Sequence, residues 1–212
     1  MEYNPDVLNH DQLYRLLVGS VVPRPIAWVS TLNGEGQRNL APFSFFNVAC
    51  PQPPTLVFAP LVRSTDGAEK DTLRNIRATG EFVINVVTEA NVEAANISSG
   101  EYPAHVDEFA LVNVTAVPSV MVAPPRVFES PVNFECRLKQ IVELGDEPGG
   151  ASLVIGSIVY IHVADEVLAA DYKIDADKLQ AVGRLAGFDY SRTRDRFVIV
   201  RPPSQIKPTA KS

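Results

Sequence analysis

Cations and hydroxyl groups gather where the sequence predicts the start of a helix. Lys70, Asp71 and Thr72 precede an apolar pattern of helical spacing, and Arg63 and Ser64 lie a few residues upstream. The first N–H groups of a helix have no partner within it, and the helix dipole favours negative charge there. Lys70, Thr72 and Arg63 are therefore candidates for binding a small anion such as phosphate. Taken alone, Asp71 is interpreted as a helix cap and Lys70 as a solvated surface lysine.

A second group of candidates combines aromatic and hydroxyl side chains in two neighbouring segments. Residues 24–31 read RPIAWVST and contain the single tryptophan of the chain, and residues 39–47 read NLAPFSFFN. Trp28 or an aromatic residue of 43–46 offers a flat apolar surface that suits a planar ring. Core burial is the alternative for each aromatic residue taken alone. The hypothesis of a ligand site therefore depends on their combination with the nearby hydroxyl groups.

Several common catalytic motifs are absent from the sequence. No GxGxxG or GxxxxGK[ST] stretch occurs, which argues against a dinucleotide-binding fold and a P-loop. No GxSxG stretch occurs, which disfavours an α/β-hydrolase. The three histidines, His10, His105 and His162, are scattered without the spacing of metal ligands. We therefore predict no metal site.

The composition is that of an acidic globular protein. A chain of 212 residues can bury a core without disulfides or a structural metal. The net charge of −6 argues against nucleic acid as the main partner, because phosphate backbones bind basic surfaces. Cys50 and Cys136 lie far apart, which favours a reducing compartment. Residues 1–20 lack the long apolar run of a signal peptide or membrane anchor, so we expect a cytoplasmic protein without membrane contact.

Alternation of apolar and polar residues predicts an antiparallel sheet. The clearest strand covers residues 132–143, and a turn at 145–150 joins it to a second long strand at 152–163. Shorter strands are expected at residues 26–31, 55–59, 81–87 and 197–200. The first of these is expected to close at the Asn33-Gly34 turn.

Helices are expected only as short elements around the sheet. Leucines between 13 and 17 predict one helix, with Asn9 and Asp11 as caps. A second helix begins near Lys70 and ends at Gly80, a residue that favours the left-handed conformation of a helix end. Weaker helical patterns cover residues 90–96 and 177–185.

These elements predict a mainly β fold with peripheral helices. Many short strands and 17 prolines favour a barrel over an open α/β sheet. No shift in composition indicates a linker, so we assign residues 1–212 to one domain. Its core is expected at about residues 16–201, followed by a loose tail at 202–212.

Several motifs together resemble the flavin reductase-like, FMN-binding split-barrel family, which includes flavoredoxins and proteins called flavoprotein oxygenases. The resemblance spans roughly residues 16–201 and depends on the order of the motifs. They read PRPIAWVST, NLAPFSFFN, KDTLRNI, TGEFVINVV, YPAHVDEF and SPVNFECRL, followed by Gly183-Arg184-Leu185 and Tyr190. The resemblance implies a six-stranded antiparallel split barrel, a homodimer, and one FMN per subunit in a cleft shared by two chains.

The chain departs from this family pattern on the substrate side. Val112-Asn113-Val114 stands where such proteins often have a Gly-Leu pair, and residues 145–150 lack a histidine often found before the next strand. These departures leave the reductant and the acceptor open.

The resemblance, joined to the chemistry of FMN, assigns roles to the candidate residues. The phosphate is expected to bind Lys70, Thr72, Arg63 and Ser44, while Asp71 caps the helix. Trp28, or an aromatic residue of 43–46 such as Phe45, is expected to cover the flavin ring. The backbone N–H groups near Ser30 and Thr31, together with Asn47, are expected to donate to N1 and O2 of the ring.

The expected function is that of an FMN-binding oxidoreductase, an NAD(P)H-dependent flavin reductase-like enzyme. It would accept hydride at FMN N5 and pass electrons to free flavin, a protein partner or oxygen. One alternative is an electron carrier like flavoredoxin, reduced by a protein partner without NAD(P)H activity. Another is a barrel that binds no flavin. No catalytic residue is assigned firmly, because hydride transfer to a flavin requires no acid or base from the protein. His105 is a candidate for contact with FMN or nicotinamide, or else an exposed loop histidine.

Overall fold

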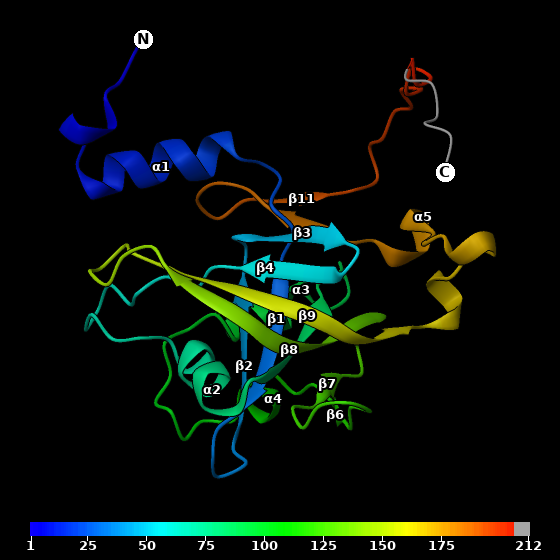
Figure 1. Ribbon diagram of the computed structural model, residues 1–212, viewed down its shortest axis with the longest axis horizontal. Coiled ribbons are helices and arrows are strands. Elements are labelled where there is room, and N and C mark those ends of the chain that lie inside the picture. The colour runs from blue at the N-terminus through cyan, green and yellow to red at the C-terminus, as the bar shows by residue number, and fades with distance from the viewer. Residues whose placement is uncertain (206–212) are drawn as a thin grey trace, which may run out of the picture.

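The computed structural model describes residues 1–205, which fold around a seven-stranded antiparallel sheet (Figure 1). The strands follow the order β2-β1-β5-β8-β9-β4-β3. Their bounds are β1 Ala27–Leu32, β2 Arg38–Phe43, β3 Phe46–Pro51, β4 Pro54–Phe58, β5 Glu81–Val86, β8 Val132–Glu143 and β9 Ser152–Val163. Two small ribbons lie beside the sheet, formed by β6 Ala116–Val117 with β7 Arg126–Val127, and by β10 Val182–Arg184 with β11 Tyr190–Arg192.

The long hairpin of β8 and β9 is confirmed at the bounds predicted from the alternation. The two strands pair antiparallel from Val132 opposite Val163 to Glu143 opposite Ser152. Two bulges interrupt the register, and bulges increase the local twist of a strand. Gly156 of β9 lies against the ring of Phe82, where a Cβ atom would meet ring carbon Cζ at 2.4 Å. The barrel interior therefore requires glycine at this position.

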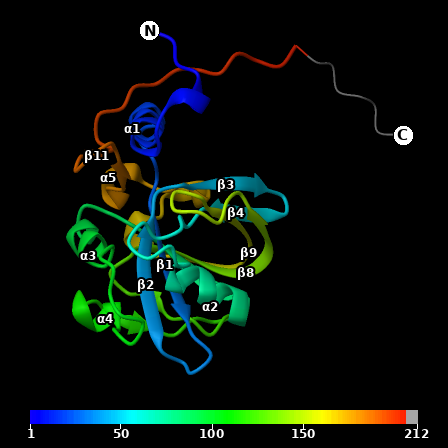
Figure 2. The ribbon, with the colours of Figure 1, turned by 90° about the vertical axis from the view of Figure 1, so that its left-hand side faces the viewer.

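The sheet curls into a barrel that is open between its two edge strands (Figure 2). These edges, β2 and β3, are consecutive in the chain and are separated only by Ser44 and Phe45. The expected split barrel is confirmed, but the count of six strands is wrong. The chain bends at Ser44 and Phe45, so the NLAPFSFFN segment contributes to two strands, β2 and β3, at opposite edges of the sheet.

Strand β1 is buried on both faces and divides the core in two. Ala27 and Val29 face the barrel interior, in a cluster with Phe58 and Phe82. Trp28 faces the other way, into a second cluster beneath α3 and α4. The polar residues Ser30 and Thr31 of this strand are buried as well, and their hydroxyl groups are hydrogen-bonded.

The helices lie around the barrel, and four of the five α-helices in the described chain overlap a predicted helical segment, whereas α4 was not predicted. They are α1 His10–Ser20, α2 Asp71–Thr79, α3 Val92–Ile97, α4 Glu108–Leu111 and α5 Ala176–Leu179, with single 3₁₀ turns at Pro5–Val7, Asp165–Val167 and Ala170–Tyr172. Asn9 caps α1 as predicted, through a reciprocal capping box with Gln12, whereas Asp11 lies inside the first turn. Gly80 ends α2 in the left-handed conformation, at φ 71°. No helix among residues 1–205 is long and apolar enough to cross a bilayer.

The prediction that Asp71 caps α2 is wrong. Lys70 occupies the N-cap position, where no side chain accepts a hydrogen bond from the helix. Asp71 is already helical, and its carboxylate pairs with Arg74 one turn later. The start of α2 is therefore left without a side-chain acceptor.

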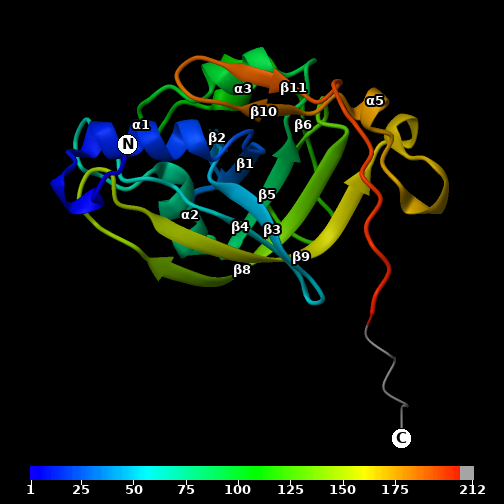
Figure 3. The same ribbon diagram turned by 90° about the horizontal axis from the view of Figure 1, so that it is seen from above.

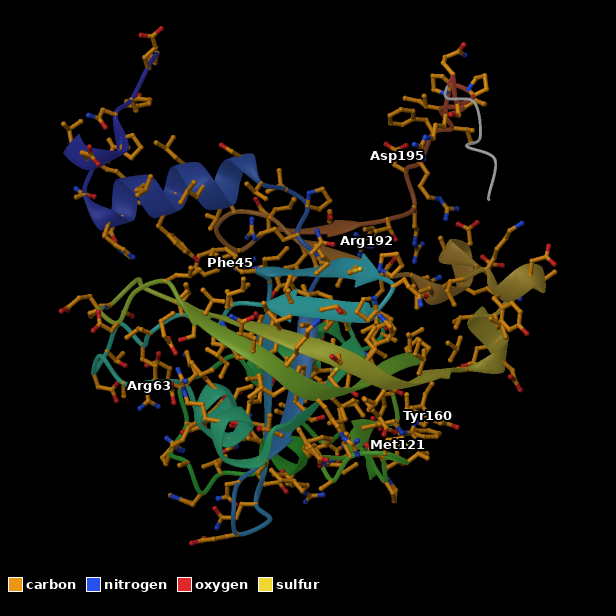
Figure 4. The ribbon with its side chains drawn as sticks, viewed as in Figure 1. Phe45, Arg63, Met121, Tyr160, Arg192 and Asp195 are labelled. Atoms are coloured by element: carbon orange, nitrogen blue, oxygen red, sulfur yellow. The ribbon has the colours of Figure 1, made fainter. Side chains whose placement is uncertain are left out.

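A buried carboxylate on β8 holds the loop that precedes β7. Glu135 is fully buried and accepts hydrogen bonds from the N–H groups of Val120 and Met121, at 2.7 and 2.6 Å. His162 of β9 lies 2.6 Å from the same carboxylate. Figure 4 shows Met121 and Tyr160 together below this end of the hairpin. The Glu135 contacts fix the loop against the outside of the barrel.

Two predictions near the C-terminus are wrong. The helix expected at 177–185 is confined to α5, because Gln180 adopts a left-handed conformation and Val182 begins β10. Residues 197–200 are extended but form no strand, because no other strand of the described chain lies alongside them. Figure 3 shows this segment leaving the body of the protein. Residues 202–205 of the predicted tail are exposed, and 206–212 lie outside the described residues.

Candidate functional site

A cleft lies over Pro42 and Phe43 at the end of β2, beside the opening of the barrel. It has two lobes that share Pro42, Phe43 and Ser99. The first, which we call the polar lobe, is lined by Asn39, Ala41, Arg63, Lys70, Asp71, Thr72, Ser98, Gly100, Glu101, Tyr102 and Glu108. The second, the Tyr190 lobe, is lined by Ile26, Ser44, Val92, Ala95, Asn96, Arg184 and Tyr190. A hydrophilic end beside a partly apolar end suits a ligand with a charged group and a flat body.

Thr72 is the best-positioned hydroxyl group of the polar lobe. Thr72 is 1% exposed, and its Oγ1 accepts a hydrogen bond of 2.9 Å from Asn39 Nδ2. The same amide donates to Thr31 Oγ1, which also accepts from Asn75. Because Thr72 Oγ1 serves as acceptor to Asn39, its own hydrogen is available for donation into the lobe.

The start of α2 adds backbone donors to the polar lobe. Its first intrahelical bonds run from the N–H groups of Leu73 and Arg74 to the carbonyl of Lys70. The N–H groups of Asp71 and Thr72 precede these bonds, and no side chain caps them. Two backbone donors and the Thr72 hydroxyl thus meet at the positive end of the helix dipole.

Both cations of the polar lobe are paired with carboxylates from their own chain. Lys70 Nζ lies 3.2 Å from Glu101 Oε1, and Arg63 makes a two-point contact with Asp66, at 2.9 and 3.0 Å. Glu101 also accepts a hydrogen bond of 2.6 Å from Thr65. The contacts from Thr65 and Lys70 hold the pKa of Glu101 below its ordinary value. Glu101 thus connects its own loop to the loop of Thr65 and Lys70. It also neutralises the Lys70 ammonium group, which an incoming anion would need.

A third carboxylate lies deeper in the lobe. Burial raises the pKa of Glu108, whose carboxylate accepts a hydrogen bond of 3.0 Å from the N–H of Leu40. Glu108 belongs to α4, so this bond fixes that helix against β2. We interpret Glu108 as a structural residue at the floor of the lobe.

The Tyr190 lobe presents a stacked pair of side chains. The Arg184 guanidinium lies over the Tyr190 ring, 4.6 Å from its centroid, and donates to the carbonyls of Gly187 and Asp189. The Tyr190 hydroxyl donates to Asn96 Oδ1 at 3.0 Å. These bonds join the β10–β11 ribbon to α3 and hold one wall of the lobe in place.

Arg24 connects the cleft to α1. This buried guanidinium donates to the carbonyls of Val18, Val21 and Leu185, at 2.6, 2.8 and 2.9 Å. Its Nε lies 3.4 Å from Ser44 Oγ, a longer contact. Arg24 therefore satisfies the last carbonyls of α1 and holds Ser44 at the boundary of the cleft.

The structure brings five of the predicted residues together at the cleft and places a sixth, Phe45, beside it. Arg63, Lys70, Asp71 and Thr72 line the polar lobe, and Ser44 lines the Tyr190 lobe. Phe45 lies beneath α1 in Figure 4 and lines an adjoining hollow that also includes Ser44 and Lys70. Figure 4 places Arg63 at the outer side of the loop above α2. Three of the four phosphate candidates, Arg63, Lys70 and Thr72, thus share the polar lobe, whereas Ser44 lies in the neighbouring lobe.

Three predicted residues lie beneath the cleft instead of lining it. Trp28 is fully buried, and its indole N–H donates to Ser98 Oγ at 2.9 Å. It therefore supports the loop of the polar lobe and is no ring cover. Ser30 and Thr31 are also fully buried, and the Ser30 hydroxyl donates to the carbonyl of Pro125. Ser30 pairs with both neighbouring strands and Thr31 with β2 alone, and neither residue lines the cleft.

Two further candidates lie outside both lobes. Asn47 is exposed on β3, where its side chain accepts a hydrogen bond from the N–H of Val48. His105 is exposed in the turn before α4. Neither residue lines the cleft in this chain.

Sequence reasoning missed most of the loop from Ser98 to Tyr102. This segment supplies Ser99, Gly100 and Glu101 to the polar lobe. The run of two serines and a glycine after a helical pattern signals a turn. Nothing local predicts that Glu101 contacts Lys70, which lies 31 positions earlier.

The fold and the cleft define a split-barrel protein with a polar lobe beside an aromatic one. Residues 18–180 match the family described as flavin reductase like domain. The chain belongs to this flavin-binding family, which confirms the resemblance stated from its motifs. It is an oxidoreductase of flavin reductase-like type.

Three relatives illustrate this similarity. An uncharacterized protein of Halalkalibacterium halodurans is 43% identical over 204 residues, 95% of this chain and 97% of that protein. The structure of nitrilotriacetate monooxygenase component B from Bacillus cereus is 33% identical, with a TM-score of 0.89 over 94% of this chain and 98% of that chain. The 2-nitrobenzoate 2-nitroreductase NbaA of Pseudomonas fluorescens is also 33% identical, with a TM-score of 0.84 over the full length of both chains.

Proposed function

We propose that this chain is an FMN-dependent oxidoreductase that accepts hydride from NAD(P)H and passes electrons to a separate acceptor. The observation that carries the proposal is the polar lobe, where Lys70, Arg63 and Thr72 surround one space at the N-terminus of α2. FMN ends in a single phosphate, and this set of donors matches a phosphate in charge and hydrogen bonding. The flavin, when bound, supplies the hydride and electron transfer.

The residues of the polar lobe have distinct tasks toward the phosphate. Lys70 supplies a mobile positive charge, and Thr72 supplies a hydroxyl donor whose direction is set by Asn39. The first N–H groups of α2 add fixed dipoles. Glu101 opposes binding, because its carboxylate holds Lys70 until the phosphate replaces it. Arg63 must likewise share its guanidinium between Asp66 and the ligand.

The Tyr190 lobe is the place for the flavin ring. Its walls, Phe43 and the stacked pair of Arg184 and Tyr190, provide flat surfaces next to the polar lobe. Ser44 lines this lobe, and its hydroxyl would donate to a polar group of the bound flavin. No acid or base of the chain is assigned to the hydride step, because these residues need only bind, orient and partly desolvate the ring.

A homodimer is part of this proposal. Two-fold pairs are the commonest small oligomers, and α1 leaves apolar side chains exposed beside the cleft. Tyr14 of α1 lines the hollow that contains Phe45 and Lys70. A second chain placed against α1 would therefore complete one wall around the flavin.

Anaerobic titration of the flavin-loaded protein with NADH and with NADPH tests the proposed activity. Loss of the yellow flavin absorbance with either nucleotide is the expected result. Reoxidation is then followed with free flavin, oxygen and 2-nitrobenzoate as acceptors. Protein that stays yellow with both nucleotides but is bleached by dithionite would contradict the NAD(P)H step and favour an electron carrier. A colourless protein that takes up no added FMN would contradict the whole proposal.

A further inference from the structure

Residues 197–205 form an extended arm with an apolar start, which we call the C-terminal arm. Phe197, Val198, Ile199 and Val200 are each between 79% and 91% exposed. The chain before the arm is held to the body: Arg194 contacts Glu89. Figures 1 and 3 show the chain running outward from β11, and Figure 4 places Asp195 far above the sheet. This ion pair fixes the chain just before the arm, and the four consecutive apolar residues of the arm then extend away from the rest of their own chain.

A face of the same molecule lacks a covering layer. Helix α1 buries only Val18, whereas Tyr14, Leu16 and Leu17 are 42–53% exposed. Figures 1 and 2 place α1 and the arm on the same side of the molecule as β3. We call this surface the α1–β3 face. An exposed apolar helix face of this kind marks an interaction site.

The edge of β3 within this face is available for strand pairing. In the described sheet β3 pairs only with β4, and Val48 at its centre is 61% exposed. The opposite sheet edge, β2, is covered by contacts from α2, α3 and α4. A free edge strand offers a row of unpaired backbone groups, and proteins usually cover such an edge.

The C-terminal arm could cover this face, because it offers both an extended backbone and apolar side chains. Successive residues of an extended segment point to opposite sides, so apolar residues at four consecutive positions require cover on both sides. An edge strand supplies the backbone partners, and the apolar side chains of α1 supply a cover. Each molecule therefore carries both an arm and a face that accepts one, and a two-fold exchange satisfies both in a closed dimer.

We propose that two copies of this chain exchange their C-terminal arms, each arm pairing with β3 and packing against α1 of the other copy. The inference deepens the proposed homodimer and rests on it. Because Tyr14 of α1 also lines the hollow beside Phe45, the arm would close the surface next to the flavin cleft.

Substitution within the arm tests the exchange without endangering the fold. Changing Phe197, Val198, Ile199 and Val200 together to serine alters only side chains that are exposed in a single copy. We expect light scattering to show a dimer for the wild type and a monomer for the variant at micromolar concentration, an increase of about 100-fold or more in the dimer dissociation constant. Tyr172→Ser is the control, because Tyr172 is 95% exposed on another element and should leave the dimer intact.

Crosslinking identifies which chain receives the arm. In a Cys50→Ser background, Val48→Cys and Val198→Cys are introduced together and treated with a short bismaleimide. The exchange predicts a covalent dimer on a denaturing gel, whereas a crosslink within one chain, or none, would overturn it. A variant that stays dimeric would overturn the arm exchange and leave the homodimer standing. A monomeric wild type would contradict both, and FMN titration of the same samples shows separately whether the flavin site holds.

Discussion

Replacing Lys70 with alanine should weaken FMN binding while leaving the fold intact. The contact between an ammonium group and a phosphate is worth about 1.5–3 kcal/mol. Binding must first break the pair of Lys70 with Glu101, whose side chains are 29% and 34% exposed, and such a pair contributes about 0.2–1 kcal/mol. The net loss is therefore about 0.5–2.8 kcal/mol, or roughly a 2- to 100-fold weaker affinity.

Titration of apo protein with FMN and with riboflavin isolates this effect, because the two ligands differ only in the phosphate. The Lys70→Ala variant should lose affinity for FMN and keep its affinity for riboflavin. Lys178→Ala is the matched control, since Lys178 is an exposed lysine of α5 outside the cleft. Thermal melting of each variant checks that it folds. If Lys70→Ala bound FMN as tightly as the wild type, the reasoning would be refuted and Arg63 would become the main phosphate candidate.

Three further predictions concern carboxylates and a hydroxyl group. Glu101→Gln should strengthen FMN binding by roughly 1.5- to 5-fold, because Lys70 is released from a surface ion pair worth about 0.2–1 kcal/mol; weaker binding in the same titration would show that Glu101 assists the ligand. Thr72→Val should weaken FMN binding by roughly 2- to 12-fold, the loss of one neutral hydrogen bond of about 0.5–1.5 kcal/mol, and unchanged affinity would place the phosphate elsewhere. Burial alone would raise the pKa of Glu135, but hydrogen bonds from His162 and two backbone N–H groups outweigh it and lower that pKa. The stability from Glu135 is then present above its ordinary value of 4.5 and is lost as the pH falls below it, so urea unfolding should find Glu135→Gln about 1–3 kcal/mol less stable at pH 7, with a smaller difference in acid. An equal difference at both pH values would contradict this reasoning.

The sequence predicted the elements whose signals are local. The bounds of β8 and β9 follow from alternation within each strand, and Gly80 ends α2 because few other residues adopt the left-handed conformation at little cost. The clustering of Lys70, Thr72 and Arg63 was also predictable, because all three lie close in the sequence to the start of one helix, where free N–H groups favour anions.

Errors arose where a residue's role depends on distant partners. Trp28 was expected against a ligand, but α3 and α4 cover that side of β1, so the ring is part of the core. Residues 197–200 have strand composition, yet no strand of the described chain pairs with them. The contact of Glu101 with Lys70 depends on the packing of two loops, which no local pattern encodes.

Identification of the flavin in the purified protein tests the central claim most directly. The account predicts a yellow protein from which denaturation releases FMN, as identified by mass spectrometry, in a ratio near one per chain. The donors of the polar lobe, Lys70, Thr72 and the first N–H groups of α2, match the single phosphate of FMN in charge and hydrogen bonding. Release of FAD as the tightly held species would contradict the account.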